Sequence, residues 1–108
     1  MIRLLPPLEP GPIVRRQLAK SATSVAFNYR ASCRARSHAE FTAKLGIVAE
    51  ESDEALGWLE FIEAANLIES ADLSRVTSEA RELLAIFSAS VGTARYKERN
   101  RTSSRKSS

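Results

Sequence analysis

From Ile13 onward, apolar residues recur at spacings of three and four, which is the period of one face of an α-helix. Three such segments are separated by short polar breaks, and they predict helices over about residues 12–33, 38–66 and 72–99. All four prolines lie within the first twelve residues, so residues 1–11 are expected to form an irregular lead-in. Residues 100–108 contain no apolar side chain and are expected to form a disordered basic tail.

Two local signals set the expected helix starts. Pro12 suits the first turn of a helix, where its missing N–H has no partner to lose. Ser37 and Glu40 have the spacing of a capping box, in which the serine hydroxyl accepts from the glutamate amide and the glutamate reaches back. Because only a few residues separate the first two helices, we expect them to pack as antiparallel neighbours.

The apolar faces differ in width. The first helix has a stripe through Val14, Leu18, Val25 and Tyr29, and the third has a narrow stripe: Leu73, Val76, Ala80, Leu83, Leu84, Phe87, Val91 and Ala94. The second has a broad arc centred on Phe41, Leu45, Val48, Ala55, Leu56, Leu59 and Ile62. Together, the three predicted helices indicate an all-α fold class, an antiparallel up-down helical bundle. The arc is widened on one side by Ile47, Trp58 and Phe61, so it is broader than contact with a single helix requires. We expect these three residues to form a self-association interface.

Charge is distributed in three blocks. Residues 1–36, 40–82 and 95–108 carry net charges of +6, −8 and +5, although the whole chain carries only +3. Basic ends can bind polyanions, and an acidic middle can pair with basic ends. The choice between those two partners is the functional question that the sequence raises.

The candidate binding surface lies on the first helix. Arg16, Lys20, Thr23, Phe27, Arg30 and Arg34 follow one another at spacings of four and three, on the side opposite the apolar stripe. Four cations and an aromatic ring on one face can hold phosphates and stack a base. The plain alternative is a solvated face, or one that pairs with acids of the second helix.

The C-terminal segment adds Arg95, Lys97 and Arg99 to this set. Basic arms commonly bind polyanions without specificity, but they also serve as solubilising termini.

The sequence supplies no set of residues for catalysis. His38 is the one histidine and Cys33 the one cysteine, and no third group orients them as a nucleophilic pair. The acids of the second helix lack the Glu-x-x-His partner of a di-metal bundle site, so we expect neither a metal nor a cofactor. No apolar run approaches the ~20 residues of a membrane span, and the lone cysteine forms no internal disulfide; both suit the cytoplasm.

Several segments together resemble a known bacterial family of four-helix bundles, named after reading frames in intervening sequences of 23S ribosomal RNA genes. They are SATSV (21–25), NYRA (28–31), CRARS (33–37), AEF (39–41), KL (44–45), EESDE (50–54) and WLE (58–60). The similarity covers about residues 17–95. It implies a homopentameric assembly and no catalytic residues, and related retroelement accessory proteins bind a reverse transcriptase and nucleic acid. Family members carry a full helix ahead of the segment matching residues 12–33, so the N-terminal helix is expected to be shortened or missing here.

The reading favoured by these observations is a non-enzymatic, cytoplasmic, homo-oligomeric helical bundle. It would bind RNA or DNA through phosphates, without sequence specificity. Two alternatives stay open: an adaptor whose basic face docks an acidic partner protein, and a structural family member with a fold but no retained function.

Overall fold

A computed structural model describes residues 11–65 and 71–107, and the described part consists of three helices without strands. Helix α1 spans Gly11–Cys33, α2 spans His38–Ala64 and α3 spans Ala71–Ser107. The predicted all-α class is therefore confirmed. The lead-in at 1–10 and the segment at 66–70 lie outside the described residues.

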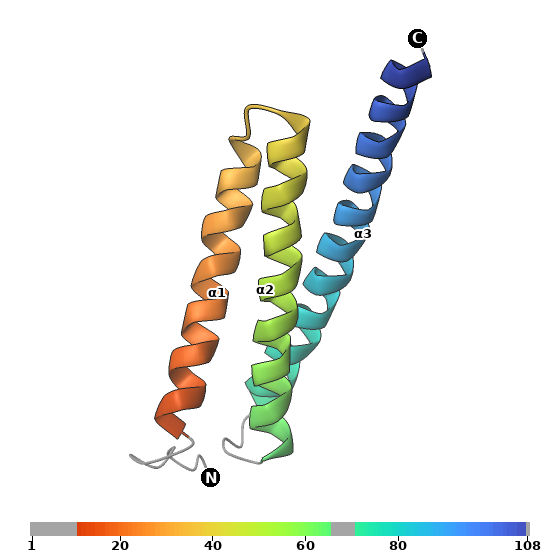
Figure 1. Ribbon diagram of the computed structural model, residues 1–108. Coiled ribbons are helices and arrows are strands. Elements are labelled where there is room, and N and C mark those ends of the chain that lie inside the picture. The colour runs from red at the N-terminus through yellow and green to blue at the C-terminus, as the bar shows by residue number, and fades with distance from the viewer. Residues whose placement is uncertain (1–10, 66–70, 108) are drawn as a thin grey trace.

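Helix α2 lies between the other two helices (Figure 1). It runs antiparallel to α1, as the short connection predicts, and α3 runs antiparallel to α2 along its other side. The molecule is elongated, with extents of 65 × 20 × 19 Å, because α3 continues past the end of the α1–α2 pair (Figure 1). This arrangement fits a shortened antiparallel bundle.

The core forms where side chains of all three helices meet. Leu45 and Val48 of α2 pack with Val91 of α3. Part-buried apolar side chains surround this cluster: Val25, Phe41, Ala49 and Phe87. Val48 has no exposed surface, and Leu56, Leu59 and Ile62 continue the buried row along α2. Burial of this row is the main favourable term that holds α2 in the middle position.

Small polar residues complete the contact face of α1. Val14, Ser21 and Ser32 are all at least 97% buried. The Ser32 hydroxyl donates to the Tyr29 carbonyl at 2.6 Å, so its burial leaves no orphaned group. Small side chains on this face let α1 and α2 approach closely.

The start of α2 shows the capping box with one adjustment. The Ser37 hydroxyl accepts from the Glu40 amide at 3.0 Å, as expected. The Glu40 carboxylate accepts from the amide of Arg36, at 3.4 Å, one residue before Ser37. The box fixes the turn that joins α1 to α2, and it also holds Arg36 against the first turn of α2.

The expected disordered tail is wrong for residues 100–107, because α3 continues to Ser107. This segment contains no glycine or proline to stop the helix. Extending an existing helix costs far less free energy than nucleating a new one, and Arg and Lys are good helix formers. Low hydropathy alone therefore did not end the helix.

The narrow stripe of α3 is less buried than its spacing predicts. Val91 and Ala94 are buried, but Val76 is 41% exposed and Leu83 is 50% exposed. Helix α3 packs on α2 alone along most of its length, so the flank that carries Val76 and Leu83 has no helix over it among the described residues. Near the middle of α3, Phe87 reaches Tyr29 of α1 with ring centroids 5.8 Å apart. Tyr29 is nevertheless half exposed, although the stripe of α1 predicts that it is buried.

Candidate functional site

The six residues of the predicted binding face are all exposed. Five of them lie on α1, and the sixth directly follows its last residue: Arg16, Lys20, Thr23, Phe27, Arg30 and then Arg34. We call these residues the α1 basic face. They occupy the side of α1 that α2 does not cover, since the buried side carries Val14, Ser21 and Ser32. The spacing argument therefore places the side chains where a ligand can reach them.

None of the cations of the α1 basic face takes part in an ion pair with another described residue. The ion pairs in the described part of the chain join Arg75 to Asp72 and Glu79, Arg81 to Glu60, and His38 to Glu98. The acids of α2 therefore do not neutralise α1, although the charge blocks of the sequence allow that pairing. The four cations keep their charge available to a partner outside the chain.

The structure brings the second basic group to the same end of the molecule. His38 directly follows the α1–α2 connection, and its Nε2 lies 3.0 Å from the carbonyl oxygen of Ala94 on α3. Exposed Arg95, Lys97 and Arg99 therefore lie at the same end of the bundle as Arg34, but across α2 from it. The packing of α3 on α2 thus brings to one end of the molecule two groups that are about sixty residues apart in sequence.

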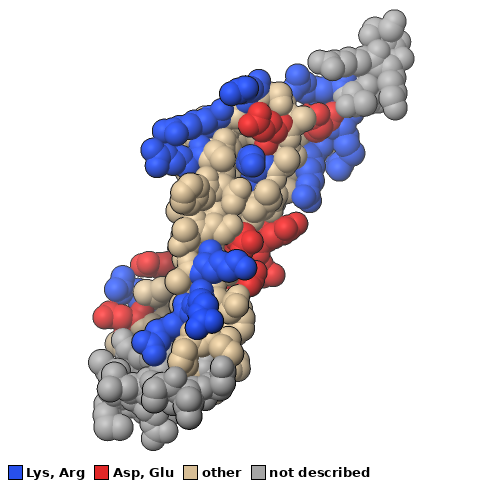
Figure 2. All heavy atoms as spheres, turned by 60° about the vertical axis from the view of Figure 1, so that its left-hand side comes forward, with Lys and Arg blue, Asp and Glu red and all other residues tan. Residues whose placement is uncertain are grey.

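The distribution of charge is visible on the face where α1 comes forward. Figure 2 shows lysine and arginine gathered towards the upper end, with a second group lower down and acidic side chains between and beside them. In the sequence, the four cations of the α1 basic face fall into two pairs, Arg16 with Lys20 and Arg30 with Arg34. At 1.5 Å per helical residue, Arg16 and Arg34 are separated by about 27 Å.

An open hollow of about 600 Å³ lies at the upper end of the α1 basic face. Its lining residues come from α1, the connection and the first turn of α2: Phe27, Arg30, Ala31, Arg34, Arg36 and Glu40. Sequence reasoning missed Arg36 as a site residue. The capping box was the signal that could have found it, because the box holds the residue before Ser37 against the first turn of α2.

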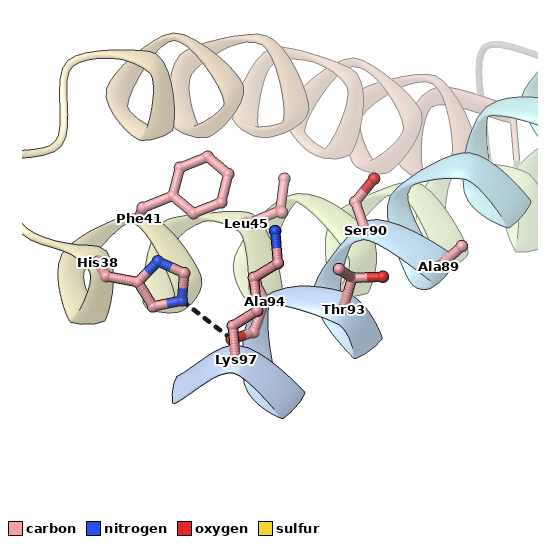
Figure 3. Close-up of a pocket in the computed structure, with 8 residues that line it drawn as sticks. All are labelled: His38, Phe41, Leu45, Ala89, Ser90, Thr93, Ala94 and Lys97. Atoms are coloured by element: carbon pink, nitrogen blue, oxygen red, sulfur yellow. Dashed lines mark hydrogen bonds between the residues drawn. The ribbon is translucent and has the colours of Figure 1, made fainter. Parts of the chain in front are cut away.

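A second hollow, of about 370 Å³, lies between the start of α2 and α3 (Figure 3). Phe41 and Leu45 form its apolar wall, and Ser90, Thr93 and Lys97 approach from α3. The Ser90 hydroxyl donates to the Ile86 carbonyl at 2.9 Å, and the His38 ring contacts the Ala94 carbonyl. The first contact lies within α3 and the second joins α2 to α3, and neither places a nucleophile beside a base.

The residues expected to form the interface lie on or beside the outer side of α2. Ile47 is 36% exposed and Phe61 is 42% exposed, while Trp58 is part-buried and meets Phe61 edge-on at 6.2 Å. Leu83 and Ile86 of α3 are more exposed than either of them, so the structure offers a second apolar surface that the stripe argument did not single out.

Neither a metal-binding cluster nor a membrane-spanning helix is found in the described part of the chain. No group of three or more His, Cys, Asp or Glu side chains that could hold a metal ion occurs among the described residues. Within the same residues, no helix is long and apolar enough to cross a membrane. Cys33 is exposed and not disulfide-bonded.

A solved structure and a family model are both similar to this chain. The chain is similar to a crystal structure, at 1.70 Å, of a protein of unknown function from the S23 ribosomal protein family of Bacteroides thetaiotaomicron VPI-5482. The two share 25% sequence identity with a TM-score of 0.67, over 74% of this chain and 71% of that one. No curated protein matches the chain.

The family model of the 23S rRNA-intervening sequence proteins matches residues 8–89, which is more than half of the chain and includes α1, α2 and the first half of α3. The chain therefore belongs to the 23S rRNA-intervening sequence protein family.

Proposed function

We propose that this chain is a non-enzymatic, cytoplasmic, self-associating bundle protein that binds RNA or DNA without sequence specificity. The observation that carries the proposal is the α1 basic face, whose four cations are exposed and have no ion-pair partner among the described residues. Exposed arginine and lysine side chains bind phosphate oxygens and release condensed counterions from the nucleic acid.

The position of Arg95, Lys97 and Arg99 supports the same proposal. They lie at the end of the bundle that also carries Arg30 and Arg34, on the other side of α2, so a polyanion that contacts both groups must cross that end of the bundle. Contacts from two helices fix the register of a strand better than contacts from one, but they read no base sequence. The proposed binding is therefore general for nucleic acid backbones.

Self-association would raise the affinity of the protein for a long nucleic acid. If apolar surface at Ile47, Trp58 and Phe61 joins several copies, each copy adds a basic face to one particle. Linked sites raise the effective affinity for a long nucleic acid without any new contact. The proposal thus assigns assembly to the outer side of α2 and nucleic acid to α1 and α3.

The experiment compares two charge-matched double variants in fluorescence anisotropy. Arg30→Ala with Arg34→Ala removes two charges from the α1 basic face, and Arg75→Ala with Arg81→Ala removes two that form ion pairs on α3. The probes are several labelled RNAs and DNAs of unrelated sequence, including a fragment of 23S ribosomal RNA, because the family's name refers to that RNA.

We expect the first variant to lose about ten-fold or more in affinity for every probe, and the second to lose less than about two-fold. Equal losses in both variants would show that only net charge matters and would contradict a site on α1. No binding by the unaltered chain at low salt would contradict the nucleic-acid proposal as a whole, and capture of acidic proteins would then become the leading alternative.

A further inference from the structure

Phe27 is the most exposed large apolar side chain in the described part of the molecule, at 73%. Six rings meet in pairs: Tyr29 meets Phe87, His38 meets Phe41 and Trp58 meets Phe61. Phe27 has no such ring contact among the described residues, and it is more exposed than Tyr96, which also has none. Most of the surface of the Phe27 ring is therefore open to solvent or to a ligand.

The surroundings of Phe27 are cationic on both sides. Along α1 it lies between Lys20 and Arg30, on the same face as both. It also forms part of the wall of the hollow that carries three guanidinium groups, those of Arg30, Arg34 and Arg36. The one carboxylate of that wall is that of Glu40, which accepts a hydrogen bond from the Arg36 amide. Because three guanidinium groups face one carboxylate, the net charge of the wall is positive.

The chemistry of this site requires two features in one ligand. Guanidinium groups bind phosphate oxygens, while the flat ring of Phe27 offers a stacking surface for another flat, polarisable ring. A nucleotide supplies both. The ~27 Å between Arg16 and Arg34 exceeds the size of a single nucleotide, so a ligand that uses the whole face must be a chain of them.

We propose that the α1 basic face is a single-strand site, in which an unpaired base stacks on Phe27 while neighbouring phosphates bind Arg30 and Arg34. This inference rests on the proposed function and names its substrate class. In a duplex the base faces are stacked on one another, so duplex DNA or RNA can offer phosphates to the arginines but no ring to Phe27. The exposed ring therefore discriminates in favour of single strands, and it does so without sequence preference because every base has a π face.

The competing geometry is entry of α1 into the major groove of duplex DNA. There Phe27 would meet base edges, where the thymine methyl group is the one apolar contact available. That geometry predicts tighter binding to duplex than to single strands and a preference for A·T pairs. The two geometries therefore give opposite results in one experiment.

The experiment measures the ratio of single-strand to duplex affinity by anisotropy. The probes are an oligodeoxythymidine of about 20 nucleotides and the same strand paired with oligodeoxyadenosine. A second single strand carries 2-aminopurine, whose emission falls when it stacks on an aromatic ring. Using a ratio cancels any change in assembly, since assembly affects both probes.

Three variants are compared with the unaltered chain. Phe27→Leu keeps apolar bulk but removes the π face, and Phe27→Trp keeps and enlarges it. Ile86→Leu changes an exposed apolar side chain of α3, away from the α1 basic face, and keeps its bulk. Because Phe27 is largely exposed, its replacement should leave folding intact, which circular dichroism checks.

We expect the unaltered chain to favour the single strand by about five-fold or more, and Phe27→Leu to lose that preference together with the 2-aminopurine signal. Phe27→Trp and Ile86→Leu should keep both. A ratio unchanged by Phe27→Leu, or duplex binding tighter than single-strand binding, would overturn the single-strand site while leaving nucleic-acid binding in place. Absence of binding to either probe would overturn both proposals.

Discussion

At the scale of single residues, position on the helix decides what each side chain does. Val48 and Leu45 are buried by α2's two neighbours, whereas Phe27 on α1 is open although it is as apolar as either. Residue type could predict that Val48 belongs inside. Only the spacing from Arg16 to Arg34 predicts that Phe27 belongs on the outer face, and only the structure shows that Arg36 joins it.

The glycines of α2 give a prediction at this scale. A Cβ built on Gly57 meets nothing within 4 Å, whereas one built on Gly46 lies 3.3 Å from the Arg95 guanidinium. Alanine is favoured over glycine inside a helix by about 1 kcal/mol. We expect Gly57→Ala to raise the free energy of unfolding by about 0.5–1 kcal/mol, and Gly46→Ala to give a smaller gain because Arg95 must shift.

Urea unfolding followed by circular dichroism measures both changes. Gly92→Ala is the matched control on α3, because its added Cβ also meets nothing within 4 Å. If Gly57→Ala destabilises the chain while Gly92→Ala stabilises it, another copy must approach α2 closely at Gly57, and the expectation of open space there is wrong.

At the scale of helices, the sequence predicts where a helix starts better than it predicts where the helix ends or which side chains it buries. The capping box marks the beginning of α2 because its signal is local and chemical. The end of α3 could not be predicted, since continuation to Ser107 depends on helix propagation and not on hydropathy. The exposure of Leu83 could not be predicted either, because a spacing pattern does not reveal whether a helix covers the flank it points to.

The burial difference between α2 and α3 yields a testable contrast. Val48→Ala removes two methyl groups from a fully buried site and should lower the free energy of unfolding by about 1–3 kcal/mol. Ile86→Ala removes more apolar volume, but the side chain is 58% exposed, so the loss should stay within about 0.5 kcal/mol.

Thermal melts at low protein concentration compare the two variants. If Ile86→Ala lowers the melting temperature as much as Val48→Ala does, the flank of α3 is covered in solution. That result would contradict the exposure of Ile86. Repeating the melts at high concentration shows whether a second copy provides that cover.

At the scale of the whole molecule, three charge blocks become a bundle with basic residues at one end and along one side. The sequence could predict the blocks and the α1 basic face from spacing alone. It could not predict that Arg95, Lys97 and Arg99 lie at the same end of the bundle as Arg34, because that depends on the packing of α3 on α2, marked by the contact between His38 and Ala94. The proposed site is therefore a product of tertiary structure as much as of helix periodicity.

Assembly is the second property of the whole molecule. We expect Ile47→Asp with Phe61→Asp to lower the molar mass of the particle, because burying two carboxylates in an apolar interface is unfavourable. Light scattering after size exclusion measures the mass. Leu83→Asp with Ile86→Asp is the control on α3, and a loss of mass in that variant alone would move the interface from α2 to α3.

The salt dependence of binding tests the central claim most directly. For a single-stranded oligonucleotide, the logarithm of the association constant falls with the logarithm of salt concentration by about 0.7 for each phosphate neutralised. Changing Arg16, Lys20, Arg30 and Arg34 to alanine should therefore flatten this slope by up to about three while the chain stays folded. A slope equal to that of the unaltered chain would show that the α1 basic face does not contact phosphates, and would contradict the account.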